Sequence, residues 1–300
     1  MEHIPCDMPQ RYAPPRSPAP PPRPRRRPGA IAAERWQEGS VCGGTLARMS
    51  SRRAALTLSD DQLVAAFMNM YAQGAFPMAE PPSIRERGKA RAREPEVHWY
   101  RPDPRAILPL QDGALRVWDG LARARKKRAF VFTADACFDR VIRACAEPGV
   151  GRGGPGETWL SPALIECYLT LHRHQRAHSI EAWLLSGESA DPGRGGFVAK
   201  VPETATLVGG IYGVSIGAAF FAESMFSRPA LGGSNASSLC LVHLWHHLRA
   251  RGYTLLDVQI SNHHTVQFGV TEIAASAYQE RLEEAIARPC AWGMPPGAGA

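Results

Sequence analysis

A glycine-punctuated apolar segment, residues 207–226 (LVGGIYGVSIGAAFFAESMF), constrains the fold more than any other part of the chain. It carries one charged residue, Glu223. Its β-branched and aromatic residues on both sides of Gly217 are typical of strands. We therefore predict two strands that are joined at Gly217.

Helical and extended patterns alternate around this segment. Ser59 and Gln62 have capping-box spacing ahead of an apolar helical pattern that ends at Gly74. Further helices are expected after Ser161, after Thr133 as a cap, and from Ser234 or Asn235 to Gly252, with strands at residues 178–185 and 254–260. The alternation predicts an α/β chain, and the hairpin makes its sheet mixed, of α+β character.

The basic charge is concentrated near the N-terminus. Residues 1–48 hold eight Arg against four acidic residues, so they contribute +4 of the net charge of +7, and residues 1–28 hold ten of the 26 prolines. Such a composition does not bury enough apolar surface to fold. We expect residues 1–55 to be a disordered Pro/Arg-rich leader, either a solvated segment or a nucleic-acid-binding arm. Met49 is an alternative natural start.

Several protein classes are disfavoured. No stretch approaches the roughly 18 apolar residues of a membrane span, and residues 1–10 lack the apolar core of a signal peptide, so we expect a cytoplasmic protein. The seven cysteines form no CxxC pair, which argues against a disulfide framework or zinc ribbon. His243, His246 and His247 have spacing that suits metal ligands, but no Glu or Cys completes a known motif, so we expect no metal.

Two polar residues stand in the apolar strand pattern LLDVQ. Asp257 and Gln259 are two apart, and side chains two apart on a strand share a face. A buried carboxylate is costly unless it is hydrogen-bonded. Asp257 is therefore either a satisfied core or strand-end residue, or part of a pair that orients a nucleophile or relays a proton.

Other polar residues are candidates for the same site. Glu223 forms an ion pair, with Arg228 as one partner, or supplies an acidic wall for a cationic substrate. His263 and His264 follow the Asp257 strand and are candidates to line a site. The basic run 123–128 (RARKKR) either contacts phosphates or forms a solvated helix face. The sequence has no GxSxG elbow, so it does not suggest a covalent acyl-enzyme.

Six motifs, in this order, resemble the leucyl/phenylalanyl-tRNA–protein transferase family. They cover residues 65–78 (AAFMNMYAQGAFPM), 98–108 (HWYRPDPRAIL), 157–183, 207–228, 235–237 (NAS) and 255–268 (LLDVQISNHHTVQF). The resemblance extends over about residues 60–285.

The resemblance implies a fold and an activity. It implies a small N-terminal α/β domain (56–122), a GNAT-like acyltransferase domain (123–287) and a flexible tail (288–300). It also implies transfer of Leu or Phe, and Met weakly, from aminoacyl-tRNA to the N-terminal Lys or Arg of acceptor proteins, which marks them for proteolysis. Neither a metal nor an organic cofactor is expected, and we expect a monomer.

The resemblance also implies roles for particular residues. Asp257 and Gln259 match the family's catalytic pair, and Glu223 matches a carboxylate at the aminoacyl pocket. The substrate-binding residues that it implies are Ile211, Phe220, Leu244 and Leu256 in the apolar pocket, Trp159 and Tyr71 at the terminal adenosine, and also Met78 and Ser227. The tRNA-binding residues that it implies are Arg123, Arg125, Lys126, Lys127, Arg128 and Arg228.

The sequence departs from the family's pattern at a few of these positions. Met78 stands where Trp is frequent, Ala222 where Gly is usual, and Leu244 where an aromatic residue is expected. These changes bear on the choice between Leu and Phe.

Two other functions remain open: an acyl-CoA-dependent GNAT N-acetyltransferase, although its pyrophosphate-binding Q/RxxGxG/A turn is not found, and a non-catalytic tRNA-binding paralogue.

Overall fold

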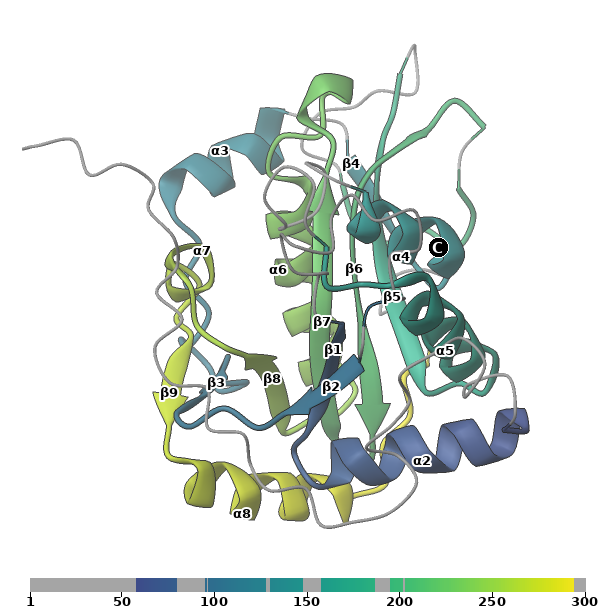
Figure 1. Cartoon of the computed structure of the whole chain (residues 1–300). Helices are drawn as coiled ribbons and strands as arrows, with labels where there is room; N and C mark the ends of the chain where they lie inside the picture. The colour runs from purple at the N-terminus through teal and green to yellow at the C-terminus, as the bar shows by residue number, and fades with distance from the viewer. Residues whose placement is uncertain are drawn as a thin grey trace, which may run out of the picture. The chain divides into compact units, whose positions relative to one another are not determined.

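The computed structural model describes residues 58–79, 95, 97–127, 130–147, 158–186, 195–201 and 203–293 (Figure 1). These residues all belong to one compact unit. The expected leader, residues 1–55, lies outside the described residues, as do residues 294–300 of the expected tail. Within the part of the chain that is described, no helix is long and apolar enough to cross a membrane.

A seven-stranded mixed sheet forms the centre of this unit, with the strand order β4-β5-β6-β7-β8-β3-β9. Its strands are β3 (Arg105–Ile107), β4 (Phe130–Ala134), β5 (Ala177–Leu184), β6 (Thr206–Ile216), β7 (Ala219–Ser227), β8 (Leu255–Gln259) and β9 (Thr271–Ile273). All neighbours are antiparallel except β7 and β8, which run parallel. The predicted α/β class with a mixed sheet is confirmed.

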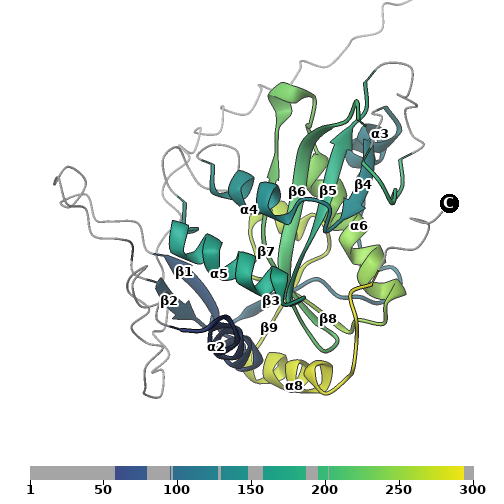
Figure 2. The same cartoon turned by 90° about the vertical axis from the view of Figure 1, so that its right-hand side faces the viewer.

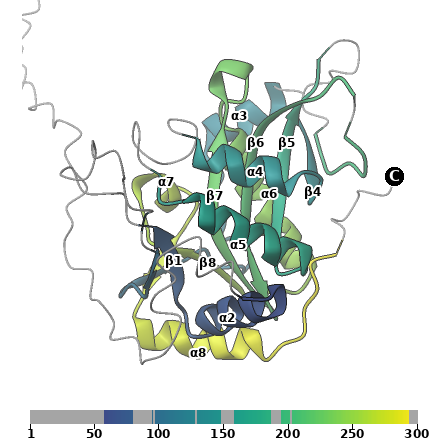
Figure 3. The same cartoon turned by 45° about the vertical axis from the view of Figure 1, so that its right-hand side comes forward.

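Helices cover both faces of the sheet. They are α2 (Asp60–Ala72), α3 (Asp119–Lys127), α4 (Phe138–Ala146), α5 (Pro162–Arg173), α6 (Ala236–Ala250), α7 (His263–Val266) and α8 (Ala275–Ile286). Figures 2 and 3 show α4 and α5 on one face and α6 on the other. Two apolar clusters match these layers: one packs α2, α4, α5 and α8 against the sheet, and the other packs α3 and α6.

Local sequence signals placed several element ends correctly. Ser59 and Gln62 form the predicted capping box of α2, and Ser161 caps α5. Gly217 joins β6 to β7 at a φ of +53°, and a Cβ there would lie 2.5 Å from the Ile286 carbonyl oxygen. Only glycine fits such a turn without strain.

The cap predicted at Thr133 is wrong. Thr133 lies inside β4, and α4 begins five residues later, with Cys137 at its N-cap. The Thr133 hydroxyl donates instead to the buried carboxylate of Glu181. A threonine before a helical pattern is also a common strand residue, and here the partner on β5 decided between the two.

A second, two-stranded sheet pairs β1 (Phe76–Ala79) with β2 (Val97–Tyr100). It is held close to α5 because the Ala79 N–H donates to the Trp159 carbonyl at 3.0 Å. The next strand, β3, joins the seven-stranded sheet between β8 and β9. The 56–122 segment thus contributes both to the small sheet and to the large one.

Candidate functional site

The parallel strands β7 and β8 separate at the point where the candidate residues lie. They are paired only at Ala219–Leu255, Phe220–Leu256 and Phe221–Asp257. Beyond this point β7 continues to Ser227 while β8 ends at Gln259. A pocket opens where the strands part, and its lining residues are Ile211, Ala222, Glu223, Ser224, Met225, Leu241, Val258, Gln259, Ile260, Asn262 and Thr265.

A β-bulge brings Glu223 into this pocket. In the β6–β7 ladder Tyr212 pairs with Ser224 and Gly213 pairs with Ala222, so Glu223 is skipped. A Cβ on Gly213 would lie 2.1 Å from the Phe221 carbonyl oxygen, so the close approach beside the bulge requires glycine. Bulges re-aim side chains and are frequent beside active sites.

Three donors hold the Glu223 carboxylate. The Tyr71 hydroxyl donates to Oε1 at 2.7 Å, and the Tyr168 hydroxyl donates to Oε2 at 3.2 Å. The Gln259 side-chain amide donates from Nε2 to Oε2 at 2.9 Å. The carboxylate thus connects two helices, α2 and α5, with the end of β8. The ion pair with Arg228 is not formed, since Arg228 pairs with Glu147 at 2.9 Å.

Burial raises the pKa of Glu223 to about 7, and the nearby Asp257 adds to this effect. The hydrogen bonds from Tyr71, Gln259 and Tyr168 act in the opposite direction. A carboxyl group with such a pKa changes its protonation state near neutral pH, as general acid–base groups do.

Asp257 is completely buried and meets Arg105, which is 1% exposed. Arg105 donates from Nε to Oδ1 at 3.0 Å and from Nη2 to Oδ2 at 2.5 Å. The Tyr278 hydroxyl donates to Oδ2 at 2.6 Å, and the Gln259 backbone N–H donates to Oδ1 at 2.7 Å. Burial lowers the pKa of Arg105, but Asp257, together with Tyr278 and Glu223, raises it by more, so that this pKa lies above its ordinary value.

Gln259 has a strained backbone at the end of β8. Its φ is +66°, a left-handed value that is uncommon outside glycine, and the Ile260 N–H donates to the Val258 carbonyl across it at 2.8 Å. This three-residue turn is a γ-turn of the strained type. Such strain clusters at functional sites, where surrounding contacts hold it in place.

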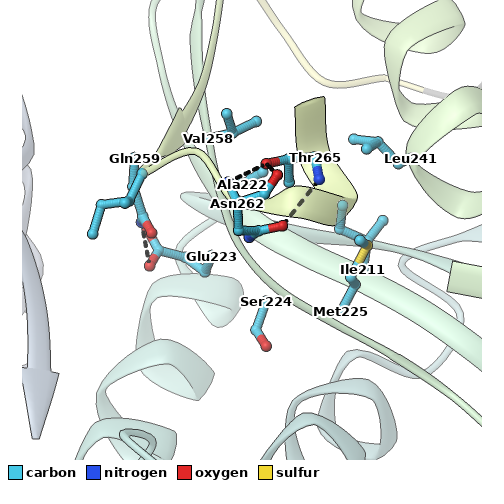
Figure 4. A pocket seen from close by; sticks show the side chains of 11 residues that line it. Ile211, Ala222, Glu223, Ser224, Met225, Leu241, Val258, Gln259, Asn262 and Thr265 are labelled. Carbon is cyan, nitrogen blue, oxygen red and sulfur yellow. Dashed lines mark hydrogen bonds between the residues drawn. The ribbon is translucent and has the colours of Figure 1, made fainter. Parts of the chain in front are cut away.

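The pocket has a polar side and an apolar side. Figure 4 shows Glu223 and Gln259 together on one side and Ile211, Met225 and Leu241 on the other. Asn262 and Thr265 complete the lining; Asn262 caps α7 by accepting the Thr265 N–H at 3.0 Å. The arrangement suits a ligand with an apolar group and a polar reacting centre.

Comparisons of the sequence with known proteins point to one family. The model of the leucyl/phenylalanyl-tRNA protein transferase family matches residues 107–190 and 197–283, more than half of the chain. The chain belongs to the leucyl/phenylalanyl-tRNA–protein transferase family. A leucyl/phenylalanyl-tRNA–protein transferase of Gloeobacter violaceus is 38% identical over 235 residues, which are 78% of this chain and 97% of that protein. One of Salinibacter ruber is 37% identical over 229 residues, which are 76% and 82% of the two chains.

Of the apolar residues expected in the transferase pocket, the structure places one in the lining. Ile211 lines the pocket. Leu244 and Leu256 are buried in the same apolar cluster behind it, and Leu241, one helical turn before Leu244, lines the pocket instead. Phe220 is buried against Trp292, with ring centroids 5.3 Å apart.

The residues expected at the terminal adenosine lie around α2 and the small sheet. Tyr71 is completely buried, and it reaches the pocket through its hydroxyl bond to Glu223. Met78 on β1 and Trp159 before α5 are half-buried and pack against the same core. Trp99 on β2 packs edge-on against α2, with its ring centroid 6.1 Å from that of Tyr71.

The basic residues expected to contact tRNA are only partly described. Arg123, Arg125 and Lys126 are exposed on α3. The side chain of Lys127 and all of Arg128 lie outside the described residues. Arg228 is half-buried, bonded to Glu147, and its guanidinium lies 5.6 Å from the centre of the Phe226 ring.

Of the histidines considered as metal ligands, His243 and His247 lie in packed positions and His246 is exposed. Among the residues that the structure describes, no three His, Cys, Asp or Glu side chains come together as a metal site would require. His243 stacks on Phe132 with ring centroids 3.8 Å apart, and burial lowers its pKa to about 3. His263 and His264 lie on α7, and His264 contacts the Ser238 hydroxyl at 3.4 Å.

Three residues that support the polar side of the pocket do not stand out in the sequence. Arg105, Tyr168 and Tyr278 were not predicted, although each makes a buried hydrogen bond to Asp257 or Glu223. Arg105 carried a signal, since it is the one charged residue of the strand Arg105–Ile107. The two tyrosines resembled ordinary apolar positions of amphipathic helices.

Proposed function

We propose that this chain moves leucine or phenylalanine, and methionine weakly, from aminoacyl-tRNA to the N-terminal Lys or Arg of acceptor proteins. Family membership supports a transferase whose donor is an aminoacyl-tRNA. The observation that carries the proposal is the Gln259 amide beside Glu223, at the edge of a pocket with an apolar wall.

The pocket suits the aminoacyl side chain. Ile211, Met225, Leu241 and Val258 offer an apolar surface without a buried charge of their own. One methylene is worth only about 1–3 kcal/mol in such a pocket, so leucine and phenylalanine are both accepted. Met225 adapts its shape more easily than a branched residue, which favours tolerance of side-chain size.

The reaction needs alignment more than activation. An aminoacyl-tRNA ester is already activated, and holding the acceptor amine against the ester carbonyl supplies much of the rate. The acceptor α-amine has a pKa of about 8, so it loses its proton readily. Gln259, oriented through Asp257, hydrogen-bonds that amine as it attacks, and backbone N–H groups stabilise the oxyanion. The covalent change is one amide bond formed and one ester bond broken, with the tRNA hydroxyl as leaving group.

The negative Glu223 and the basic α3 have complementary tasks in this proposal. Glu223 attracts the cationic N-terminal residue of the acceptor, and Arg123, Arg125 and Lys126 contact the acceptor stem of the tRNA. The protein works as a cytoplasmic monomer, and its products carry an N-terminal residue that leads to proteolysis.

The acyl-CoA alternative has a structural argument against it. A pyrophosphate would need free backbone N–H groups at the start of α6. The Ala236 N–H donates to the Gly233 carbonyl at 3.0 Å, and the Ser237 N–H donates to the Ser227 hydroxyl at 2.9 Å. Ser227 therefore ties β7 to α6 at the place where a cofactor phosphate would have to bind.

A transfer assay tests the proposal. Purified protein is mixed with tRNA that carries labelled Leu or Phe and with a reporter protein that begins with Arg, or with the same reporter beginning with Ala. Label on the Arg reporter only is the expected result. Label on neither reporter would contradict the proposal, and a rise in melting temperature with acetyl-CoA would favour the acyl-CoA alternative.

A further inference from the structure

Arg105 is a buried cation that takes no part in the chemistry proposed above, yet it lies directly behind the site. Besides its three hydrogen bonds to Asp257, it donates from Nη1 to the Gly74 carbonyl at 2.8 Å. Its guanidinium lies 4.9 Å from the centre of the Phe76 ring and 4.7 Å from that of Tyr278. Each of its three nitrogens therefore has a partner, and two aromatic rings fix its position.

Arg105 belongs to a network of hydrogen bonds that surrounds Gln259. Asp257 accepts the Gln259 backbone N–H, while Glu223 accepts the Gln259 side-chain amide. Glu223 is in turn held by Tyr71 on α2, and Arg105 holds the carbonyl of Gly74, just beyond the end of that helix. Both groups that fix Gln259 are thus tied, directly or through α2, to one guanidinium.

Asp257 is not placed to take a proton from substrate. Its Oδ1 accepts from Arg105 and Gln259, and its Oδ2 accepts from Arg105 and Tyr278. It is also completely buried. A carboxylate with its oxygens occupied in this way acts on the reaction only through the residues that it holds, of which Gln259 lines the pocket.

We propose that Arg105 is a positioning residue for the transfer reaction. Through Asp257 it keeps Gln259 in its left-handed turn, and through Gly74 it keeps α2 and Tyr71 in register with Glu223, so that the Gln259 amide faces the pocket. Tyr278 is the second support of Asp257. This inference rests on the proposed function, because it requires Gln259 to act on the acceptor amine.

Arg105→Lys is the informative substitution. Lysine keeps the charge but lacks the planar fork that bonds a carboxylate with two nitrogens while a third reaches elsewhere. We expect the single-turnover rate to fall about 30-fold, as for the loss of a preorganised contact, while KM for both substrates stays within about twofold. Arg249→Lys is the matched control, since Arg249 also pairs with an acid, Asp112, and lies over a ring, that of Trp245, on α6.

A double-mutant cycle separates positioning from a general effect on folding. In a Gln259→Ala background Arg105→Lys should change the rate by less than about twofold, because the residue through which it acts is gone. Thermal melting of every variant shows how much of it is folded at the assay temperature. An unchanged rate for folded Arg105→Lys, a loss confined to KM, or an equal loss in the Gln259→Ala background would overturn the inference.

Tyr278→Phe tests the positioning role through Asp257 if Arg105→Lys does not fold. This variant keeps the ring beside Arg105 and removes only the bond to Asp257. Its rate should fall about threefold to tenfold, with no further loss in the Gln259→Ala background. A folded Tyr278→Phe with the wild-type rate would then refute the inference. Failure of the wild-type protein itself to transfer label would instead refute the proposed function.

Discussion

Two glutamates of the central sheet, Glu223 on β7 and Glu181 on β5, are both buried but differ in their surroundings. Burial raises the pKa of each to about 7. Glu181 accepts bonds from the hydroxyls of Thr133 and Ser179 and from the Ala136 N–H. Glu223 instead accepts from two tyrosines and from the amide of Gln259.

The difference lies in access to the pocket. Glu223 lines the pocket and Glu181 does not. The partners of Glu181 are two hydroxyls and a backbone amide, which satisfy a buried carboxylate. A raised pKa by itself therefore does not mark a functional carboxyl group in this sheet; contact with the pocket and with the side-chain amide of Gln259 distinguishes Glu223.

The largest expected difference between the two glutamates is in the transfer rate. Glu223→Gln should slow transfer about 100-fold, in the range found when one preorganised electrostatic contact is removed from an active site. Glu181→Gln should leave the rate within about threefold, because it affects packing only. Single-turnover assays on both folded variants measure this. Equal losses of transfer rate in the two variants would show that Glu223 has no greater part in the reaction than Glu181.

The two glutamates should contribute alike to the pH dependence of stability. The unfolded chain loses each proton near the ordinary pKa of 4.5, whereas the native state keeps it until about pH 7. Stability therefore falls as pH rises through this window, by about 2 kcal/mol per glutamate between pH 5 and 7. Urea unfolding of the wild type and of each Gln variant measures it. A Glu181→Gln variant with the wild-type slope would contradict the pKa assigned to Glu181.

The pH profile of the transfer rate should depend on Glu223 and not on Glu181. Ionised Glu223 accepts the Gln259 amide, so its ionisation with a pKa of about 7 should contribute about a tenfold rise to the rate at saturating substrates between pH 6 and 8. The Glu181→Gln variant should keep this rise. Glu223→Gln should show only the part that is due to the acceptor amine, and an unchanged profile in that variant would exclude Glu223 as its source.

The smallest effect concerns two left-handed residues, one near each glutamate. Gln259 has a φ of +66° and Asp135, near Glu181, has a φ of +56°. Gln259→Gly relieves strain, so stability should stay within about 1 kcal/mol while the transfer rate falls. Asp135→Gly relieves similar strain but removes bonds to His178 and to the Ser179 N–H, so it should cost about 1–2 kcal/mol. Chemical unfolding measures the stability of both variants. A similar loss of stability in both would mean that the Gln259 turn, like that of Asp135, stabilises the fold.

Local signals in the sequence were sufficient for most elements of the fold. Ser59, Ser161 and Gly217 act on neighbours a few residues away, so their capping and turn roles were predicted from spacing alone. The helix cap predicted at Thr133 was wrong because the hydrogen-bond partner of Thr133, Glu181, is 48 residues away in the sequence. Bonds of that range depend on strand pairing, which one sequence does not reveal.

The site was predicted unevenly for the same reason. Asp257, Gln259 and Glu223 stood out as polar residues in apolar strands, and the family resemblance named them. Their side chains do not simply share a face, because Gln259 leaves the strand in a left-handed turn and Asp257 holds its backbone N–H instead. Arg105 reaches Asp257 across 152 residues, and no local pattern specifies such a contact.

The bulge at Glu223 also makes the carboxylate easy to lose without loss of the sheet. Glu223 is the extra residue between two regular stretches of the β6–β7 ladder, so removal of that one residue would leave Ala222 and Ser224 in consecutive register opposite Gly213 and Tyr212. The sheet would close without a gap, and the carboxylate would be gone. A three-nucleotide deletion is therefore a short evolutionary route from a transferase to a folded protein that keeps its basic surface and has no reaction left to perform.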